Sequence, residues 1–139
     1  MKKKTKTKTS PRKKLVKKLD DICSKYIKLR DSYTCQRCGK TNAESQIHLS
    51  HVIPRSAGMR LRWDELNSKA LCAYCHRRWW HANTLEATEW FKIVFPERYE
   101  YVMSEKTKGS RKFANFELEE MIADFKHKIE NMNTEDIPF

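Results

Sequence analysis

The 139-residue sequence contains no apolar run that approaches the length needed to cross a lipid bilayer, so an integral membrane protein is not expected. Its lysine-rich beginning lacks the apolar stretch of a secretory signal, and we therefore expect a cytoplasmic protein. No acidic residue occurs in residues 1–18, which carry ten Lys and Arg. No internal repeat is present either, and the length fits one domain with a core of modest size.

Positive charge is concentrated in the first part of the chain. The formal net charge is +11, and residues 30–80 contribute nine basic against four acidic residues. Residues 81–139 carry eight basic and twelve acidic residues, so the C-terminal part is negative. A lysine-rich terminus alone serves solubility equally well. Together with a positive central region, however, it predicts binding to a polyanion, and nucleic acid is the favoured partner.

Both flanks of the chain show patterns of their own. Residues 1–11 alternate Lys and Thr and cannot pack, so we expect a disordered basic tail. Residues 12–30 place apolar side chains at spacings of three and four, which predicts an amphipathic helix with Cys23 on its core side. The same spacing recurs in residues 83–132 and predicts a helical C-terminal part, interrupted by a loop over residues 104–114.

Two Cys-x-x-Cys pairs bracket the central region. In a reducing compartment, such pairs indicate metal ligands rather than disulfides. Four thiolates give a tetrahedral sulfur site, which suits structural Zn²⁺. The 33 residues between the pairs exceed the roughly 15–20 of a simple zinc ribbon, so the gap must hold structure of its own. The predicted zinc ligands are Cys35, Cys38, Cys72 and Cys75.

The segment between the cysteine pairs predicts a β-hairpin followed by a helix. Alternating side chains over residues 47–53 predict a strand, which Pro54 ends, and residues 67–71 predict the return strand. A basic loop over residues 55–62 connects them. At the second cysteine pair, residues 73–81 suit a helix.

Two histidines of this segment are candidates for hydrolytic chemistry. His51 stands near the end of the first strand, and the ordinary pKa of histidine lies near neutrality, as a general base requires. His76 stands in the first turn of the following helix and can bind a divalent cation. A base that activates water and a cation that polarises phosphate are the two groups that phosphodiester cleavage needs.

The order of these motifs resembles that of the HNH endonucleases. Cys-x-x-Cys-Gly, Ser-His-Val-Ile-Pro, Asn67 and Leu-Cys-x-x-Cys-His follow one another within residues 33–81. The resemblance implies an α+β fold, with a small ββα-metal core and a four-cysteine zinc site between an N-terminal helix and C-terminal helices, all in one domain over residues 12–139. Within the family, Ser-His-Val-Ile-Pro-Arg and the basic loop are most similar to the phage NinG/Rap recombination proteins.

The same resemblance implies a role for each motif residue. His51 matches the general base, and His76 matches a ligand of the catalytic cation, Mg²⁺ or Mn²⁺. Asn67 matches the asparagine that braces the hairpin and orients the base without touching the metal. The four cysteines match the structural zinc ligands. Cleavage in such enzymes leaves 5′-phosphate and 3′-hydroxyl ends.

The sequence departs from the family pattern at Ser50, where many HNH enzymes carry Asp or His as a second ligand of the catalytic cation. A serine hydroxyl is a weak ligand, and His48 can replace it because it lies on the same strand face. His81 follows His76 by five residues, about half a turn out of line on a regular helix. His48 and His81 fit phosphate contact or a surface position better than ligation, but two histidines at the site would favour Mn²⁺, Ni²⁺ or Zn²⁺ over Mg²⁺.

Arginine is abundant around these motifs. Its guanidinium suits bidentate contact with phosphate, although a solvated basic face is the alternative interpretation. Adjacent positions of a regular helix cannot both face inward fully, so at least one of Trp79 and Trp80 is expected in the core. The candidate phosphate contacts are Arg55, Arg60, Arg62, Arg77 and Arg78.

The resemblance implies a metal-dependent endonuclease that hydrolyses DNA, encoded by or derived from a phage, with branched recombination intermediates as candidate substrates. Two alternatives stay open. One is a non-catalytic zinc-containing DNA-binding or recombination adaptor that has lost the catalytic cation through Ser50. The other is a homing or restriction-type HNH enzyme. A homodimer and contacts with other recombination or phage proteins also stay open.

Overall fold

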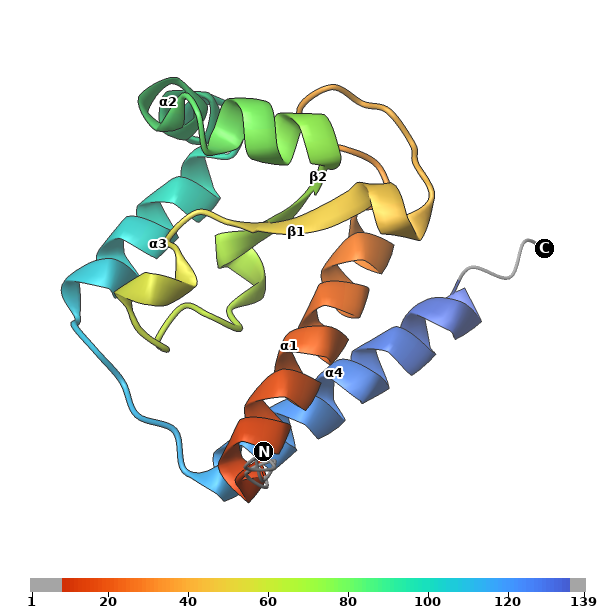
Figure 1. Ribbon diagram of the computed structural model, residues 1–139, viewed down its shortest axis with the longest axis vertical. Coiled ribbons are helices and arrows are strands. Elements are labelled where there is room, and N and C mark those ends of the chain that lie inside the picture. The colour runs from red at the N-terminus through yellow and green to blue at the C-terminus, as the bar shows by residue number, and fades with distance from the viewer. Residues whose placement is uncertain (1–8, 136–139) are drawn as a thin grey trace, which may run out of the picture.

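A computed structural model describes residues 9–135, and Figure 1 shows their arrangement. The helices α1 and α4 lie side by side on one side of a two-stranded antiparallel sheet, and α2 and α3 lie toward the other. The predicted α+β class is confirmed. Residues 1–8 of the expected basic tail lie outside the described residues. The principal elements are α1 (Pro11–Arg30), β1 (Ile47–His51), β2 (Ser68–Cys72), a π-helical segment (Cys75–Trp80), α2 (Thr84–Val94), α3 (Pro96–Thr107) and α4 (Asn115–Glu135).

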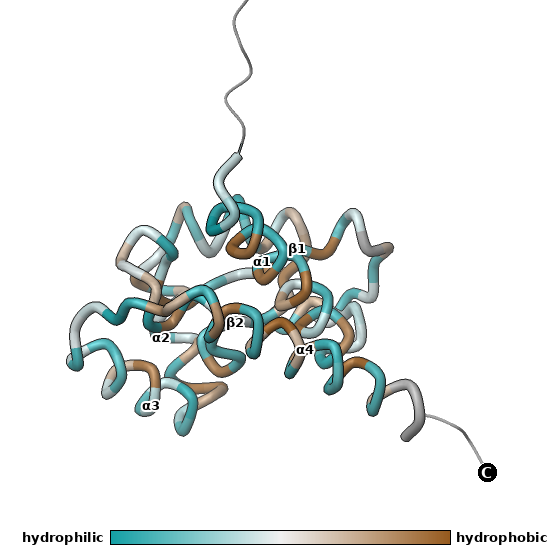
Figure 2. Tube along the Cα trace, turned by 90° about the horizontal axis from the view of Figure 1, so that it is seen from below, coloured by the Kyte–Doolittle hydropathy of each residue, from teal (hydrophilic) through white to brown (hydrophobic). Residues whose placement is uncertain are grey.

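The predicted N-terminal helix is confirmed as α1. The Ser10 hydroxyl accepts a hydrogen bond from the Lys13 backbone N–H at 3.2 Å, and Pro11 occupies the first turn, where its missing N–H has no intrahelical partner to lose. Cys23 is fully buried, so its predicted place in the core is also confirmed. Hydrophobic positions recur along α1 and α4 (Figure 2), and the two helices share one core cluster with Trp63 and Phe113.

The hairpin joins the two halves of the motif region. β1 and β2 pair with Ile47 opposite Cys72 and His51 opposite Ser68. β1 ends at His51, two residues before the predicted end, because the Asn67 side chain takes the backbone N–H of Ile53. This pairing places His51 and the second cysteine pair at opposite ends of the hairpin.

The helix predicted over residues 73–81 is present, but most of it is not a regular α-helix. Residues 75–80 form a π-helical segment, in which backbone hydrogen bonds span five residues instead of four. The backbone N–H of His81 accordingly donates to the carbonyl of His76 at 3.2 Å. Side chains five residues apart are therefore aligned, and His81 lies beside His76 instead of half a turn away.

The π-helical segment also buries two adjacent tryptophans. Trp79 and Trp80 are 5% and 4% exposed, so both belong to the core cluster under α2. The Trp79 ring packs edge-on against Trp90, with ring centres 5.2 Å apart. The Trp80 ring covers the ammonium of Lys69 instead. The wider helix thus lets neighbouring side chains reach different parts of the core.

The C-terminal part is helical as predicted, although α3 continues to Thr107 and occupies the beginning of the loop expected over residues 104–114. Phe113 in the rest of that connection is buried against Trp63, with ring centres 5.7 Å apart. Within residues 9–135, no helix is long and apolar enough to span a membrane.

Candidate active site and metal centre

The four cysteines of the two Cys-x-x-Cys pairs converge on one point. All four sulfur atoms lie within 4.8 Å of one another, and those of Cys38 and Cys72 are 3.9 Å apart. Tetrahedral zinc with Zn–S bonds of about 2.3 Å holds its sulfur ligands about 3.8 Å apart, so the observed spacing fits zinc. Cys23, the fifth cysteine, does not belong to this cluster.

Neighbouring groups hold the cysteine cluster in place. The backbone N–H of Gln36 donates to the Ala70 carbonyl at 3.0 Å and ties the first knuckle to β2. The Arg37 guanidinium lies 3.6 Å from the Cys75 sulfur and 4.2 Å from the centre of the Trp79 ring. Burial raises the pKa of Cys75 to about 12, whereas backbone N–H donors outweigh burial at Cys35 and lower its pKa to about 7, so Cys35 loses its proton more readily.

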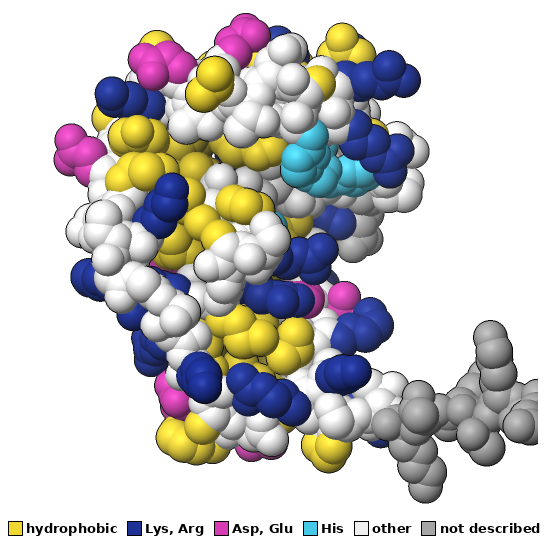
Figure 3. Space-filling model, turned by 60° about the vertical axis from the view of Figure 1, so that its left-hand side comes forward, with side chains coloured by type: hydrophobic (Ala, Val, Ile, Leu, Met, Phe, Trp, Pro, Cys, Tyr) yellow, Lys and Arg dark blue, Asp and Glu magenta, His cyan; other side chains and the backbone are white. Residues whose placement is uncertain are grey.

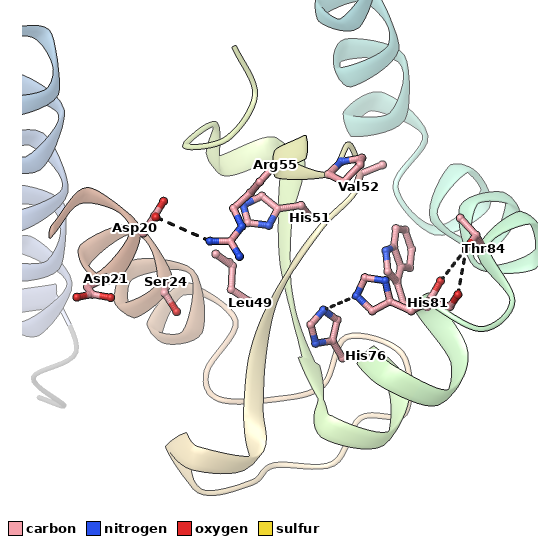
Figure 4. A pocket seen from close by; sticks show the side chains of 12 residues that line it. Asp20, Asp21, Ser24, Leu49, His51, Val52, Arg55, His76, His81 and Thr84 are labelled. Carbon is pink, nitrogen blue, oxygen red and sulfur yellow. Dashed lines mark hydrogen bonds and ion pairs between the residues drawn. The ribbon is translucent and has the colours of Figure 1, made fainter. Parts of the chain in front are cut away.

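A cleft of about 580 Å³ lies between α1 and the π-helical segment (Figure 4). The hairpin and its loop supply the floor, including His51 and Arg55, while His76 and His81 line the far wall. Figure 3 shows this hollowed face, with histidine side chains on one side and Lys and Arg around it. The sequence-predicted base and cation ligand therefore share one cavity.

Three histidines form a chain at the wall of this cleft. His76 Nε2 lies 3.1 Å from His81 Nε2, and His76 Nδ1 lies 3.0 Å from His48 Nδ1. Among these three, His76 and His81 line the cleft, whereas His48 approaches His76 from β1 behind it. Burial, and then the neighbouring His81 and His48, lower the pKa of His76 to about 4. His76 is thus neutral at pH 7, the state in which imidazole binds a metal.

His51 is oriented by a backbone carbonyl. Its Nε2 lies 3.0 Å from the Arg62 carbonyl oxygen, and because a carbonyl only accepts, Nε2 must carry the proton. In the neutral ring, Nδ1 then holds the lone pair. Burial is the largest cause that lowers the pKa of His51 below its ordinary value, and the charges of Arg55 and Lys69 add to it. Neutral His51 is the form that can accept a proton.

Asn67 is fully buried and holds the loop between the strands. Its side-chain oxygen accepts from the Ile53 N–H at 2.8 Å, and its amide donates to the carbonyls of Ile53 and Leu61 at 3.0 and 2.9 Å. Asn67 does not line the cleft. These bonds fix both ends of the loop that carries the floor of the cleft.

Ser50 does not reach the cleft. It is fully buried, and its hydroxyl lies 3.1 Å from the ammonium nitrogen of Lys69, the residue opposite it on β2. Lys69 is itself fully buried, with its nitrogen 3.2 Å from the centre of the Trp80 ring. A buried lysine therefore occupies the hydroxyl that stands where the family pattern would place a cation ligand.

The five predicted phosphate contacts fall into two groups. Arg77 and Arg78 are exposed beside the histidines, and the Arg55 side chain is 58% exposed at the cleft, where its guanidinium lies 3.8 Å from Asp20 (Figure 4). Arg60 and Arg62 instead make internal contacts. Arg60 donates to the Gly109 carbonyl at 2.7 Å, and Arg62 grips Asp20 of α1.

Comparison with protein-family models decides the identity of the central region: residues 35–89 match the HNH endonuclease model. Residues 35–89 form an HNH endonuclease domain. The four-cysteine cluster fits the zinc-bearing form of this family, and the domain supports a nuclease-type function with DNA as the partner. Searches of curated proteins and of solved structures gave no match. The matched segment of the HNH domain leaves out α1, α3 and α4.

Three features in and around the HNH domain were not predicted from the sequence. The alignment of His81 with His76 depends on the π-helical geometry, for which the sequence offers no local signal. In the sequence, Lys69 looks like an ordinary strand residue, and its burial depends on the rings of Trp80 and Phe91, which pack against its ammonium group. From the sequence, Asp20 looks like part of a charge-balanced helix, because its partners Arg55, Arg62 and Trp63 are far away along the chain.

Proposed function

We propose that this protein is a metal-dependent endonuclease that hydrolyses DNA phosphodiester bonds. One observation carries the proposal: His51 from β1 and the His76–His81 pair from the π-helical segment line the same cleft. The pairing of a neutral histidine base with a histidine cation site, facing one cavity, suits hydrolysis of a phosphodiester.

His51 is the proposed general base. Its Nε2–H is held by the Arg62 carbonyl, so Nδ1 is the atom that takes a proton from water. Asn67 supports this arrangement by holding the loop between His51 and Arg62 at both ends. The products of the proposed reaction are a 5′-phosphate and a 3′-hydroxyl.

His76 and His81 are the proposed ligands of the catalytic cation. Their facing nitrogen atoms are 3.1 Å apart, close to the separation of adjacent ligands on a cation with bonds of about 2.1 Å. When bound there, the cation would polarise the phosphate and stabilise the leaving oxygen. His48 meets the opposite nitrogen of His76, so its role is to orient that ring, and Ser50 contributes no ligand.

The nitrogen ligands bear on which cation the enzyme uses. Imidazole suits Mn²⁺, Ni²⁺, Co²⁺ and Zn²⁺, whereas Mg²⁺ prefers oxygen ligands. We therefore infer that Mn²⁺ supports cleavage better than Mg²⁺. The structural zinc of the four cysteines is a separate ion with no part in the reaction, and it requires a compartment in which the thiols stay reduced.

The DNA backbone is proposed to lie along the cleft. Arg55 at its floor and Arg77 and Arg78 beside the histidines are the exposed cations available for phosphate. Arg60 and Arg62 are less suited, because their side chains are only 22% and 19% exposed and are held by short bonds within the protein. Branched recombination intermediates as substrate, and a phage origin, rest on the sequence resemblance alone.

A non-catalytic DNA-binding adaptor is the second candidate, since Ser50 is withdrawn from the site and bound to Lys69. Supercoiled plasmid and a four-way DNA junction, each incubated with Mn²⁺, with Mg²⁺ and with chelator, separate the two. The nuclease proposal expects metal-dependent nicking or resolution. Binding of both DNAs without cleavage under any of the cations would support the adaptor and overturn the nuclease. Faster cleavage of the junction than of the plasmid would support the branched substrate.

A further inference from the structure

Asp20 of α1 reaches across to the loop that holds His51. Its Oδ1 accepts from Arg62 Nε at 3.0 Å and from the Trp63 indole N–H at 2.8 Å, and its Oδ2 accepts from Arg62 Nη2 at 2.7 Å. This is a bidentate guanidinium–carboxylate pair with a third donor added, a geometry that fixes orientation as well as charge. The side chains of Asp20 and Arg62 are only 24% and 19% exposed, so water competes little for these bonds.

The two residues that donate to Asp20, Arg62 and Trp63, are consecutive, and the peptide unit between them contains the Arg62 carbonyl. That carbonyl is the acceptor for His51 Nε2–H, at 3.0 Å. Asp20 therefore anchors both sides of the peptide group that selects the tautomer of the base. The Trp63 ring, 3% exposed and packed on Phe113, restrains the same peptide from the core side.

The charge state of Asp20 suits this task. Burial alone would raise its pKa, but the hydrogen bonds from Arg62 and Trp63 outweigh burial and lower it. Asp20 is thus a carboxylate at neutral pH and can accept all three hydrogen bonds. Its neighbour Asp21 also lines the cleft, but its side chain is 68% exposed, and it forms an ion pair with Lys17 at the surface of α1 rather than a bond to the loop.

We propose that Asp20 is a positioning residue for the general base, acting on His51 through Arg62 and Trp63. The proposal rests on the assignment of His51 as the base. It gives α1, which lies outside the matched HNH segment, a direct part in the active site. Asn67 holds the loop from within the hairpin, and Asp20 holds it from the neighbouring helix.

The test compares Asp20→Asn with Asp21→Asn. Both variants remove one negative charge from adjacent cleft-lining positions of the same helix, so their general electrostatic effects on DNA affinity are similar, although Asp20→Asn also removes the ion pair with Arg55. For Asp20→Asn, we expect the single-turnover cleavage rate to fall about 10- to 100-fold, the range found when groups that support a reactive residue are removed. DNA affinity should match that of Asp21→Asn, whose rate should stay within about twofold of wild type, as expected of a surface pair.

A second readout does not depend on cleavage. Nitrogen-15 NMR of the imidazole rings should show His51 as the Nε2–H tautomer in wild type and in Asp21→Asn, and as a mixture of tautomers in Asp20→Asn. If wild type fails to cleave DNA but this difference appears, the positioning holds and the proposed function is wrong. If Asp20→Asn matches Asp21→Asn in both rate and tautomer, Asp20 does not position the base.

A third variant covers the case in which Asp20→Asn does not fold. Trp63→Phe keeps an aromatic ring against Phe113 and removes the indole N–H that donates to Asp20, together with part of the buried ring. We expect a smaller loss of rate than for Asp20→Asn, in the same direction, with a partial shift of the His51 tautomer. If folded Trp63→Phe keeps the wild-type rate and the wild-type His51 tautomer, the hydrogen bond from Trp63 to Asp20 does not help to position the base.

Discussion

His81 Nε2 lies 3.1 Å from His76 Nε2, although the two residues are five positions apart. On an α-helix, such residues point in directions about 140° apart, because each residue turns the helix by about 100°. The π-helical hydrogen bond from the His81 N–H to the His76 carbonyl closes this gap. Segments of this kind are frequent at functional sites, and here the geometry brings together the two nitrogen atoms that we propose as cation ligands, which the spacing alone does not predict.

His81 should therefore matter for cation binding. We expect His81→Ala to raise the Mn²⁺ concentration needed for half-maximal cleavage about 10- to 100-fold, since even groups that only support a metal ligand have effects of this size. Titration of the cleavage rate with Mn²⁺ measures it. His127→Ala is the control, because His127 is an exposed histidine of α4 that contacts Asn131 away from the cleft. Equal Mn²⁺ dependence in the two variants would exclude His81 as a ligand.

The cysteine cluster should hold one zinc ion per chain. Cys72→Ser removes one of four converging sulfur atoms, and we expect loss of the metal and of the cooperative unfolding transition, because structural zinc contributes directly to folding. Cys23→Ala removes a buried thiol of the α1 core and should retain zinc. Metal analysis by mass spectrometry checks both. Zinc retained at full stoichiometry in Cys72→Ser would contradict the ligand set.

Lys69 should make stability depend on pH. Burial lowers the pKa of Lys69 well below its ordinary value, with Asp31 opposing. Between the two pKa values the unfolded chain binds more protons than the folded one, so the free energy of unfolding rises with pH, up to the ordinary pKa of about 10.5.

We expect wild type to gain stability relative to Lys69→Met between pH 7 and pH 9, by at most about 1.4 kcal/mol per pH unit. Urea unfolding of the zinc-bound proteins measures the difference. Lys126→Met, at an exposed position of α4, should follow the wild-type curve. Parallel curves for wild type and Lys69→Met would mean that Lys69 keeps its proton in the folded state.

Cleavage should also follow the charge of His51. Burial lowers the pKa of His51, as do Arg55 and Lys69, whereas the Arg62 carbonyl and Asp20 act in the opposite direction. The neutral base is the active form, so the rate should rise as pH increases through the lowered pKa, and the midpoint of this rise should lie below pH 6.5, the ordinary pKa of histidine. Single-turnover rates at saturating Mn²⁺ and DNA would show this.

A variant of Arg55 tests whether His51 is the group that titrates in this pH profile. Arg55→Gln removes a cation that lowers the pKa of His51, so the rising limb of the pH profile should move to higher pH. An inflection that stays in place in Arg55→Gln, or one above pH 7 in wild type, would argue against His51 as the titrating group.

Much of the site was predictable because it depends on local sequence. The Cys-x-x-Cys spacing determines the two knuckles, and the strand alternation places His51 at the end of β1. The apolar spacing of α1 predicts its buried face, including Cys23. In each case the information lies within a few residues of the feature.

The features that were missed depend on distant partners. The π-helical segment buries Trp79 and Trp80 against different neighbours, Trp90 on α2 and Lys69 on β2, and that packing overrides the regular helical repeat. The withdrawal of Ser50 follows from Lys69 opposite it, which is visible only once the strand register is known. The contact of Asp20 with the loop requires the docking of α1 on the hairpin.

The most direct test of the central claim is the single-turnover rate of DNA cleavage by His51→Ala in Mn²⁺. We predict a loss of about 10²- to 10⁴-fold, the usual contribution of a general base, with zinc content, Mn²⁺ affinity and DNA affinity unchanged. His127→Ala, measured alongside, should cleave as wild type. A cleavage rate in His51→Ala equal to that of His127→Ala would contradict the account.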